Sequence, residues 1–358
     1  MIIALCQINQ TVGEHEMNRD KIISYYKKSI IEGSQLTVFP ELAITGYPPQ
    51  DLLLEKSFID ISMESFDKIS SEVGSTPLII GHVYKESDFL YNTASILQNG
   101  KVVGRHKKIL LPNYDVFDEH RYFTPGDESK PIEVIINGTS ISIGLQICED
   151  LWNDNYNRDI TQELVKAGSD LIINISASPY TSGKSKYREK LIKERVSKFS
   201  IPFLYCNLVG GQDELIFDGN SLFFSKNGVV TARGKSFEEE IIMIDFDKKD
   251  KISVKKFSRE EELFSALKLG IRDYFYKSGH NKSVVGLSGG IDSALTACLG
   301  AESLGKENIL CINMPSRFSS NHSKKDSKDL ALNLGVSYKV VPIDDLLLNY
   351  EEIFKKEF

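Results

Sequence analysis

The segment "SVVGLSGGIDSALT", residues 283–296, decides the fold of the C-terminal part of the chain. The apolar stretch "KSVVGL" predicts a strand, and "DSALTACLGAESLG" predicts a helix. Gly289 and Gly290 stand between them and let the backbone approach an anion closely. The helix N-terminus that follows directs free N–H groups and the positive end of the helix dipole to the same point. We interpret the segment as a phosphate-binding loop, with a tight connection that binds nothing as the alternative.

The side chains of this loop add hydrogen-bond donors and a possible metal ligand. Ser288 and Ser293 carry hydroxyl groups, and Asp292 can either hold Mg²⁺ or cap the helix. The segment contains no Lys in the position that a Walker A loop requires, and its spacing differs from G-x-G-x-x-G. It is therefore predicted to bind phosphate in a way that differs from both of those motifs.

The residues after the loop continue the same alternation of strand and helix. The strands "ILCINMP" and "SYKVVPI" flank the helical segment "SKKDSKDLALNLG". This order predicts the opening of a doubly wound parallel α/β sheet. Three strands make about half of an ordinary sheet of this kind, so we expect this domain, residues 259–358, to be incomplete in the chain.

The first 247 residues predict a different architecture. Helical segments such as "NRDKIISYYKKSIIEG" alternate with strands such as "IIALCQI", and the dipeptide Asn-Gly recurs between strands, as in a hairpin turn. This pattern favours helix-covered sheets with long hairpins over a pure doubly wound sheet. The charged segment at residues 248–258 is predicted to be a linker.

Composition and charge exclude several classes of protein. The chain has 358 residues, a formal net charge of −7 and 41% hydrophobic residues, and no apolar run is long enough for a membrane helix. We expect no nucleic-acid or membrane partner. Its five cysteines include no C-x-x-C pair and predict neither a disulfide framework nor a zinc site. These features indicate a soluble, cytoplasmic protein.

Three ionisable residues of the first domain each stand at the end of a predicted strand: Glu41 in "TVFPELA", Lys108 in "GRHKKILL" and Cys148 in "ISIGLQICED". A cysteine thiolate is a strong nucleophile, and a nearby ammonium lowers the thiol pKa and stabilises an oxyanion. A glutamate can carry the proton. Together they form a complete set for amide hydrolysis through a thioester, although each alone has a structural alternative as a core thiol, a solvated lysine or a turn residue.

The three residues and their flanks resemble the nitrilase superfamily, whose triad is Glu, Lys and Cys in this chain order. The matching flanks are "FPEL", "KILL" and the pattern G-x-x-I-C-x-D, whereas Leu110 stands where the superfamily often has His. Alignment on "KxxLPNY" selects Lys108 over Lys107, and neighbouring residues of a strand face opposite ways. The resemblance implies an α-β-β-α sandwich and a second glutamate, Glu119, beside the lysine.

The loop "SGGIDSA" resembles the pyrophosphate loop of the ATP pyrophosphatases. This resemblance implies ATP binding by the loop residues Ser288, Gly289, Gly290, Ile291, Asp292 and Ser293, with Mg²⁺ as cofactor and Asp292 as a ligand of that ion. The segment "CINMPSRFSSNHS" is similar to NAD synthetases of that family, and by position Met314, Ser316 and Arg317 are candidates to border the adenosine. The implied fold of this half is adenine nucleotide alpha hydrolase-like.

Longer stretches, "ELAITGYPPQDLL", "LPNYDVFDEHRYF" and "NISASPYTSGK", resemble the glutaminase domains of glutamine-dependent NAD synthetases. The resemblance implies a glutamine pocket, with Lys184 facing the substrate α-carboxylate. The implied pocket residues are Tyr47, Tyr114, Glu149, Ser178 and Lys184. Ordinary packing and loop polarity are the alternatives for each.

The combined resemblance implies a two-step reaction. Glutamine hydrolysis in the first domain supplies ammonia, and the second domain uses ATP to amidate deamido-NAD⁺, releasing AMP and pyrophosphate. We expect an internal ammonia passage and a homo-oligomer. The alternatives are a stand-alone amidase of the nitrilase superfamily and an ATP-binding regulatory module without chemistry.

Overall fold

The chain forms two compact units. The computed structural model describes residues 1–152, 156–248, 250, 252 and 257–355. Contacts within the chain divide it into Met1–Ser258 and Arg259–Phe358. The predicted linker at 248–258 includes residues 249, 251 and 253–256, which lie outside the described residues, so that its role as a linker stays a prediction.

The first unit contains two six-stranded sheets of mixed direction. The first sheet has the strand order β14-β1-β2-β3-β4-β5 and begins with β1 (Ile2–Gln7) at the N-terminus. Its other strands are β2 (Leu36–Val38), β3 (Leu78–Glu86), β4 (Phe89–Gln98), β5 (Lys101–Lys107) and β14 (Glu240–Asp245). The second sheet, with the order β13-β12-β9-β8-β7-β6, consists of β6 (Ile132–Ile136), β7 (Thr139–Ile147), β8 (Leu171–Ser176), β9 (Phe203–Asn207), β12 (Leu222–Phe224) and β13 (Val230–Arg233).

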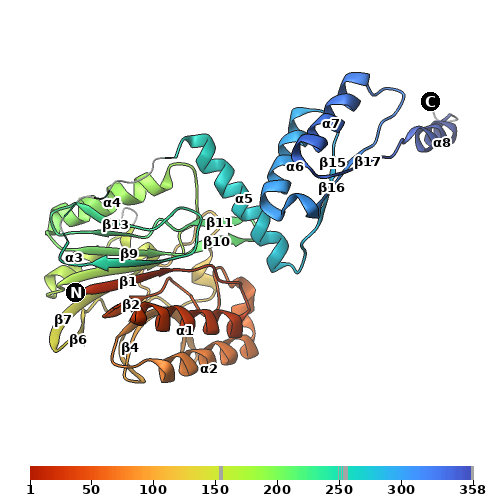
Figure 1. Ribbon diagram of the computed structural model, residues 1–358. Helices are drawn as coiled ribbons and strands as arrows, with labels where there is room; N and C mark the ends of the chain where they lie inside the picture. Colours follow the sequence, from red (N-terminus) through yellow and green to blue (C-terminus); the bar gives the residue numbers. More distant parts are fainter. Residues whose placement is uncertain (153–155, 249, 251, 253–256, 356–358) are drawn as a thin grey trace. The chain divides into compact units, whose positions relative to one another are not determined.

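Side chains on alternate strand positions build the layers of this unit. Leu5 of β1 points into the core between the two sheets, where Leu145 and Ile173 of the second sheet meet it, whereas Cys6 points to the outer face. The helices α1 (His15–Ile31) and α2 (Lys56–Glu72) cover the first sheet, and α3 (Ile160–Lys166) and α4 (Lys184–Phe199) cover the second. Figure 1 shows these layers. The predicted α-β-β-α sandwich is confirmed.

Two of the predicted Asn-Gly hairpins have the backbone that the dipeptide favours. Asn99 and Gly100 both have positive φ, 52° and 71°, as do Asn137 and Gly138, 49° and 79°. Positive φ at both central residues is the mark of a type I′ turn. One ribbon was not predicted: β10 (Val209–Gln212) pairs with β11 (Leu215–Asp218), where two glycines weaken the strand pattern.

The second unit contains a three-stranded parallel sheet in the order β15-β16-β17, formed by β15 (Ser283–Gly286), β16 (Ile309–Asn313) and β17 (Ser337–Val340). The helix α6 (Ile291–Leu304) connects the first two strands, and α7 (Asn321–Leu334) connects the next two. The helices α5 (Arg259–Lys277) and α8 (Asp344–Phe354) precede and follow the sheet. Parallel strands joined by helices confirm the predicted α/β class of this domain.

No helix in the described part of the chain combines the length and the apolar character that a bilayer-spanning segment requires.

Candidate active site

Glu41 lies in a turn that closely crosses the neighbouring strand. The strand β2 ends at Val38, and Glu41 follows Pro40. Gly81 of β3 donates its N–H to the Pro40 carbonyl at 3.1 Å and accepts from Ala43 N at 2.8 Å. A Cβ atom on Gly81 would lie 2.6 Å from the Glu41 Cα. Glycine at this position therefore permits the path of the backbone that buries Glu41.

Lys108 follows the last residue of β5, and its neighbour faces the opposite way. Lys107 reaches the surface, where its Nζ lies 2.7 Å from Glu86 Oε2. Lys108 is buried, with only 1% of its side chain exposed, and its backbone N–H donates to the Asn92 carbonyl at 2.8 Å. The two neighbouring lysines thus face opposite ways, as the strand pattern predicted.

Lys108 Nζ contacts two buried carboxylates. It donates to Glu41 Oε1 and to Glu119 Oε1, each at 2.8 Å, and Tyr47 Oη also donates to Glu119 Oε1, at 3.0 Å. Burial opposes the ammonium form, but the charges of Glu119 and Glu41 outweigh it and raise the pKa of Lys108 well above its usual value. Burial raises the pKa of Glu119 to about 7, against the opposing charge of Lys108. The lysine is therefore a permanent cation at this site.

Cys148 stands at the end of β7, on a sharp turn. Its φ is +42°, which is unusual for a residue with a side chain, and it starts the short 3₁₀ helix η3 (Cys148–Leu151). Burial, followed by the charge of Glu41, raises the pKa of the Cys148 thiol well above its usual value, and Lys108 only partly opposes this effect. The lysine lowers the pKa of the thiol, as expected, but burial outweighs this single cation and the net direction is upward.

Asp150 connects the segment around Lys108 to the segment that leads to Cys148 by hydrogen bonds. Its Oδ1 accepts from the backbone N–H groups of Ile109 and Leu110, at 3.0 and 2.9 Å. Its Oδ2 accepts from Ile147 N at 3.0 Å and lies 2.8 Å from His106 Nε2. Residues on either side of Lys108 and the residue before Cys148 thus share one carboxylate, which fixes their separation.

Glu41 is held by three donors. Asn92 Nδ2 and Lys108 Nζ both donate to Glu41 Oε1, and the backbone N–H of Ala177 donates to Oε2 at 2.8 Å. Three donors on its two oxygens fix the position of this fully buried carboxylate. Glu41 is therefore placed to accept a proton.

A second acidic group lies directly after the cysteine. Glu149 is buried, and it accepts hydrogen bonds from Tyr114 Oη at 3.0 Å and from Tyr156 Oη at 3.2 Å. Burial raises the pKa of Glu149, while Lys108 and the two phenols oppose the rise. Tyr114 is half exposed, so this group borders the surface and can meet an incoming ligand.

The remaining predicted pocket residues lie between β8 of the second sheet and the start of α4. Lys184 is the first residue of α4, and its Nζ lies 5.5 Å from the ring centroid of Trp152. Burial lowers the pKa of Lys184, and its electrostatic interaction with Cys148 opposes this effect. Ser178 is buried, and its backbone N–H donates to Asn207 Oδ1 at 3.0 Å.

The sequence pointed to no role for Asn92, His106, Ala177 or Tyr156, and Asp150 entered only as the last residue of the pattern G-x-x-I-C-x-D. Asn92 stands in the strand "LYNTAS", where asparagine is uncommon, and this signal could have identified it. Asp150 is two residues beyond Cys148 at a predicted strand end. The backbone N–H of Ala177 and the phenol of Tyr156 offer no such signal, because only the fold brings them near the acidic groups.

In the second unit, the glycine-rich loop lies between β15 and α6, as predicted. Gly289 has a φ of +93°, and a Cβ atom there would lie 2.2 Å from the Ser323 carbonyl oxygen. The Ser288 and Ser293 hydroxyl groups lie 3.0 Å apart, and Ser293 Oγ donates to the Gly290 carbonyl. Ile291, which starts the helix, is 80% exposed. The loop is therefore compact, and its helix N-terminus is open to a ligand.

The candidate adenosine residues follow β16. Met314 is exposed, and its Cε lies 3.5 Å from where a Cβ atom on Gly286 would stand. The Ser316 backbone N–H donates to Ser319 Oγ at 3.0 Å. Arg317 forms an ion pair with Glu351, and its backbone N–H donates to Asp344 Oδ1 at 2.7 Å. Met314 thus lies beside β15, the strand that precedes the loop, whereas Arg317 contacts Glu351 and Asp344 of α8.

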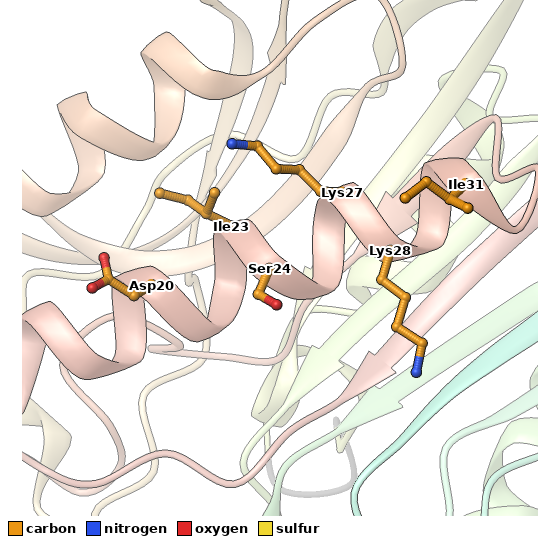
Figure 2. Close-up of a pocket in the computed structure, with 6 residues that line it drawn as sticks. All are labelled: Asp20, Ile23, Ser24, Lys27, Lys28 and Ile31. Carbon is orange, nitrogen blue, oxygen red and sulfur yellow. The ribbon is translucent and has the colours of Figure 1, made fainter.

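Three further observations concern candidate metal ligands and a surface hollow. Within the described residues, no cluster of three or more His, Cys, Asp or Glu side chains is suited to a metal ion. Asp292 is an exposed carboxylate in the first turn of α6. Figure 2 shows a hollow along α1 in the first unit, and it includes none of the predicted site residues: its lining consists of Asp20, Ile23, Ser24, Lys27, Lys28 and Ile31.

Comparison with known families agrees with the two units. Residues 2–256 match the carbon-nitrogen hydrolase family, and residues 263–358 match the NAD synthase family.

Relatives carry both parts together. The chain is 39% identical to the glutamine-dependent NAD(+) synthetase of Aquifex aeolicus, over 99% of this chain and 68% of that protein. It is 38% identical to the enzyme of the same name from a Synechocystis strain, over 98% of this chain and 66% of that protein. The chain thus spans about two thirds of the length of these curated relatives.

Solved structures support the same assignment. A glutamine-dependent NAD⁺ synthetase from Acinetobacter baumannii, in complex with adenosine diphosphate, superposes with a TM-score of 0.93 at 31% identity, over 100% of this chain and 67% of that chain. An amidase from a Nesterenkonia species, at 21% identity and a TM-score of 0.59 over 68% of this chain and 89% of that chain, shares the fold of the first unit. With both domains present and the identity to its relatives extending over nearly its whole length, the chain belongs to the family of glutamine-dependent NAD(+) synthetases.

Proposed function

We propose that the first unit hydrolyses the side-chain amide of glutamine with Cys148 as nucleophile, and that the ammonia serves ATP-dependent amidation of deamido-NAD⁺ to NAD⁺. The buried contact of Lys108 with Glu41, beside Cys148, carries this proposal. The names of the relatives support the choice of glutamine as the amide and of NAD⁺ as the product.

Acylation begins from a neutral thiol, because the pKa of Cys148 is raised by burial. Glu41 takes the thiol proton as sulfur attacks the amide carbon, so that no free thiolate needs to exist beforehand. The carbonyl oxygen becomes an oxyanion, and the Lys108 ammonium stabilises it. Glu41 then returns the proton to the amide nitrogen, the carbon–nitrogen bond breaks, and ammonia leaves behind a glutamyl thioester.

Deacylation repeats the sequence with water. Glu41 accepts a proton from the water molecule that attacks the thioester carbon, and it returns that proton to the departing sulfur. The products are glutamate and the free thiol of Cys148. A single carboxylate can serve both half-reactions because each one returns it to its ionised state.

The groups around the cysteine suit an amino acid as substrate. Glu149 offers a buried carboxylate to an α-ammonium group, and the phenols of Tyr114 and Tyr156 hold its orientation. Lys184, at the start of α4, suits the α-carboxylate, with the positive end of the helix dipole beside it. Tyr47 and Ser178 complete the buried side of the proposed pocket.

The second unit is proposed to use ATP. The ADP-bound structural relative supports a nucleotide site, and the loop from Ser288 to Ser293 presents the α6 N-terminus to phosphate. Met314, Ser316 and Arg317 are proposed to border the adenosine. ATP transfers its AMP group to the nicotinate carboxylate of deamido-NAD⁺ and releases pyrophosphate, after which ammonia displaces AMP and forms the amide of NAD⁺.

Mg²⁺ is proposed to accompany the nucleotide. The exposed carboxylate of Asp292, in the first turn of α6, fits an oxygen-preferring cation that takes its other ligands from phosphates and water. When bound, the ion neutralises phosphate charge during transfer. Asp292 itself only holds the ion in place beside the loop.

The cellular setting and the route of ammonia belong to the same proposal. Ammonia is protonated in bulk water and then loses its nucleophilicity, so an internal passage, assembled in a homo-oligomer, favours transfer. A cytoplasmic location suits the five free cysteines. Isotope-labelled ammonium added during turnover with unlabelled glutamine tests the passage: free exchange of label into NAD⁺ would rule it out.

Glutamine hydrolysis tests the core of the proposal. The wild-type chain is expected to release glutamate from glutamine, and Cys148→Ala is expected to lose that release while it still binds ATP. Cys206→Ala is the matched control, because Cys206 is also a buried free cysteine of the first unit and its thiol donates to the backbone carbonyls of Cys6 and Val38. Equal glutamate release by wild type and Cys148→Ala would refute Cys148 as the nucleophile, and no release by either protein would favour a binding module.

A further inference from the structure

Asn92 contacts both Glu41 and Lys108. It lies on β4, is 1% exposed, and donates from Nδ2 to Glu41 Oε1 at 2.8 Å. Its backbone carbonyl accepts the Lys108 N–H at 2.8 Å. One residue therefore contacts the backbone of the lysine and the carboxylate that the lysine also binds.

The orientation of the Asn92 side chain is fixed by chemistry. An ionised carboxylate only accepts hydrogen bonds, so the amide nitrogen must face Glu41. The amide oxygen, Oδ1, is then buried without a hydrogen-bond partner among the described residues. An unsatisfied buried acceptor is unfavourable, and an apolar side chain would avoid it. Its presence indicates that the donor on the same amide has a role worth that cost.

Glu41 needs such a donor because much of its surroundings opposes a negative charge. Lys108 is the cation that faces it, whereas the carboxyl groups of Glu119 and Glu149 interact with its charge. The neutral thiol of Cys148 and the neutral phenol of Tyr47 are also in its surroundings. Glu119 also shares the lysine ammonium. A neutral donor stabilises the Glu41 carboxylate without taking up the positive charge that an oxyanion requires.

We propose that Asn92 is a positioning residue for the general base, which keeps Glu41 ionised and fixes its orientation toward Cys148. Asn92 holds Oε1, and the N–H of Ala177 holds Oε2, so that the carboxylate plane cannot rotate freely. This inference rests on the proposed role of Glu41 in amide hydrolysis. No contact of Asn92 with substrate is required.

The test is the pH profile of kcat/KM for glutamine in an isosteric variant, and in particular its acid limb, the range in which the value rises with pH. In Asn92→Asp, the new carboxyl donates to Glu41 only when protonated and repels it when ionised. The acid limb of kcat/KM for glutamine is therefore expected to move up by about one pH unit or more, with a loss of about tenfold or more at neutral pH. Thr93→Val is the matched control, since Thr93 is the next buried residue of β4 and, within the described part of the chain, its hydroxyl donates to the Tyr91 carbonyl at 3.4 Å, away from the site.

A second measurement does not depend on glutamine. Iodoacetamide alkylates the Cys148 thiol with help from the same base, and mass spectrometry of the peptide that contains Cys148 follows its rate against pH. The acid limb of the alkylation rate is expected to shift to higher pH in Asn92→Asp and to remain at the wild-type pH in Thr93→Val. Asn92→Ser, which shortens the side chain, is expected to move it the same way and serves if Asn92→Asp does not fold.

The outcomes separate this inference from the proposed function. A wild-type chain that is alkylated at Cys148 but releases no glutamate would refute glutamine hydrolysis. The pH dependence of the alkylation rate in wild type and variants would still decide the role of Asn92. If the folded variants melt at a lower temperature but keep the wild-type acid limb in both assays, Asn92 only packs, and the inference is overturned.

Discussion

Replacing Gly81 by alanine tests how closely the Glu41 turn must approach β3. The added Cβ atom would lie 2.5 Å from the Pro40 carbonyl oxygen and 2.6 Å from both Glu41 Cα and Leu42 N. Because ordinary contact begins at 3.4 Å, the turn must retreat by about 0.9 Å. All three atoms belong to the backbone, so no flexible side chain can move aside. A retreat of this size breaks the 2.8 Å contacts of Glu41 with Lys108 and Ala177 N.

The expected losses follow from that displacement. A misplacement of about 1 Å in a catalytic group can lower the rate by about 100-fold, and overpacking a buried site costs about 1–3 kcal/mol. We therefore expect Gly81→Ala to lose about 100-fold in kcat for glutamine. Its melting temperature should fall by about 2–4 °C for each kcal/mol lost.

Glutamate release and thermal unfolding of the same preparations provide the assay. Gly74→Ala is the control, because a Cβ atom on Gly74 meets nothing within 4 Å and its φ is not in the left-handed region. It should match wild type in both measurements. A folded Gly81→Ala protein with activity within about twofold of wild type would show that the turn can adjust without loss, and the link between this glycine and the base would be wrong.

Three further predictions concern other parts of the molecule. Asp150→Asn should lower kcat for glutamine by about 10- to 100-fold with little change in KM, because an amide cannot accept at both ends; an unchanged kcat would refute the role of Asp150. Between pH 4.5 and about 7, folded wild-type protein should become less stable as pH rises, because Glu119 holds its proton longer when folded, with a pKa raised to about 7. The free energy of unfolding, measured by chemical denaturation at several pH values, should decline less with rising pH for Glu119→Gln than for wild type. Parallel declines in the two proteins would show that Glu119 is not the cause. Gly289→Ala should weaken ATP binding, measured by calorimetry, by about tenfold or more through backbone strain, while ATP-independent glutamate release stays unchanged. Undiminished ATP binding would show that the loop is not part of the ATP site.

The layers of both units could be predicted because local patterns agree with the fold. Nearly continuous apolar runs such as "IIALCQI" mark strands that are buried on both faces, and the Asn-Gly turns give the hairpins. Glu41, Lys108 and Cys148 each stand at a strand end, where a change from apolar to ionisable residues is visible in the sequence. Their chain order added the resemblance that joined them into one site.

The remaining parts of the site depend on contacts between distant segments. The N–H of Ala177 reaches Glu41 across 136 positions of the chain, and a backbone group carries no signal in the residue names. The direction of the Cys148 pKa was also out of reach, because the sequence shows a lysine but not the depth of burial that outweighs it. The β10–β11 ribbon was missed because Gly210 and Gly211 lower the strand propensity of its first strand.

The charges of the site lead to one further conclusion about how a buried thiol can react. Lys108 is held as a cation by two carboxylates, so a resting thiolate at Cys148 would add a third negative charge around one ammonium. Burial and Glu41 both disfavour that state, and the thiol stays neutral. When the thiol proton moves to Glu41 during attack, one negative charge disappears from the carboxylate as another forms on the substrate oxygen. The number of charges around Lys108 then stays constant along the reaction. Nucleophile and base are thus coupled through the lysine, and the raised pKa of the thiol becomes compatible with catalysis.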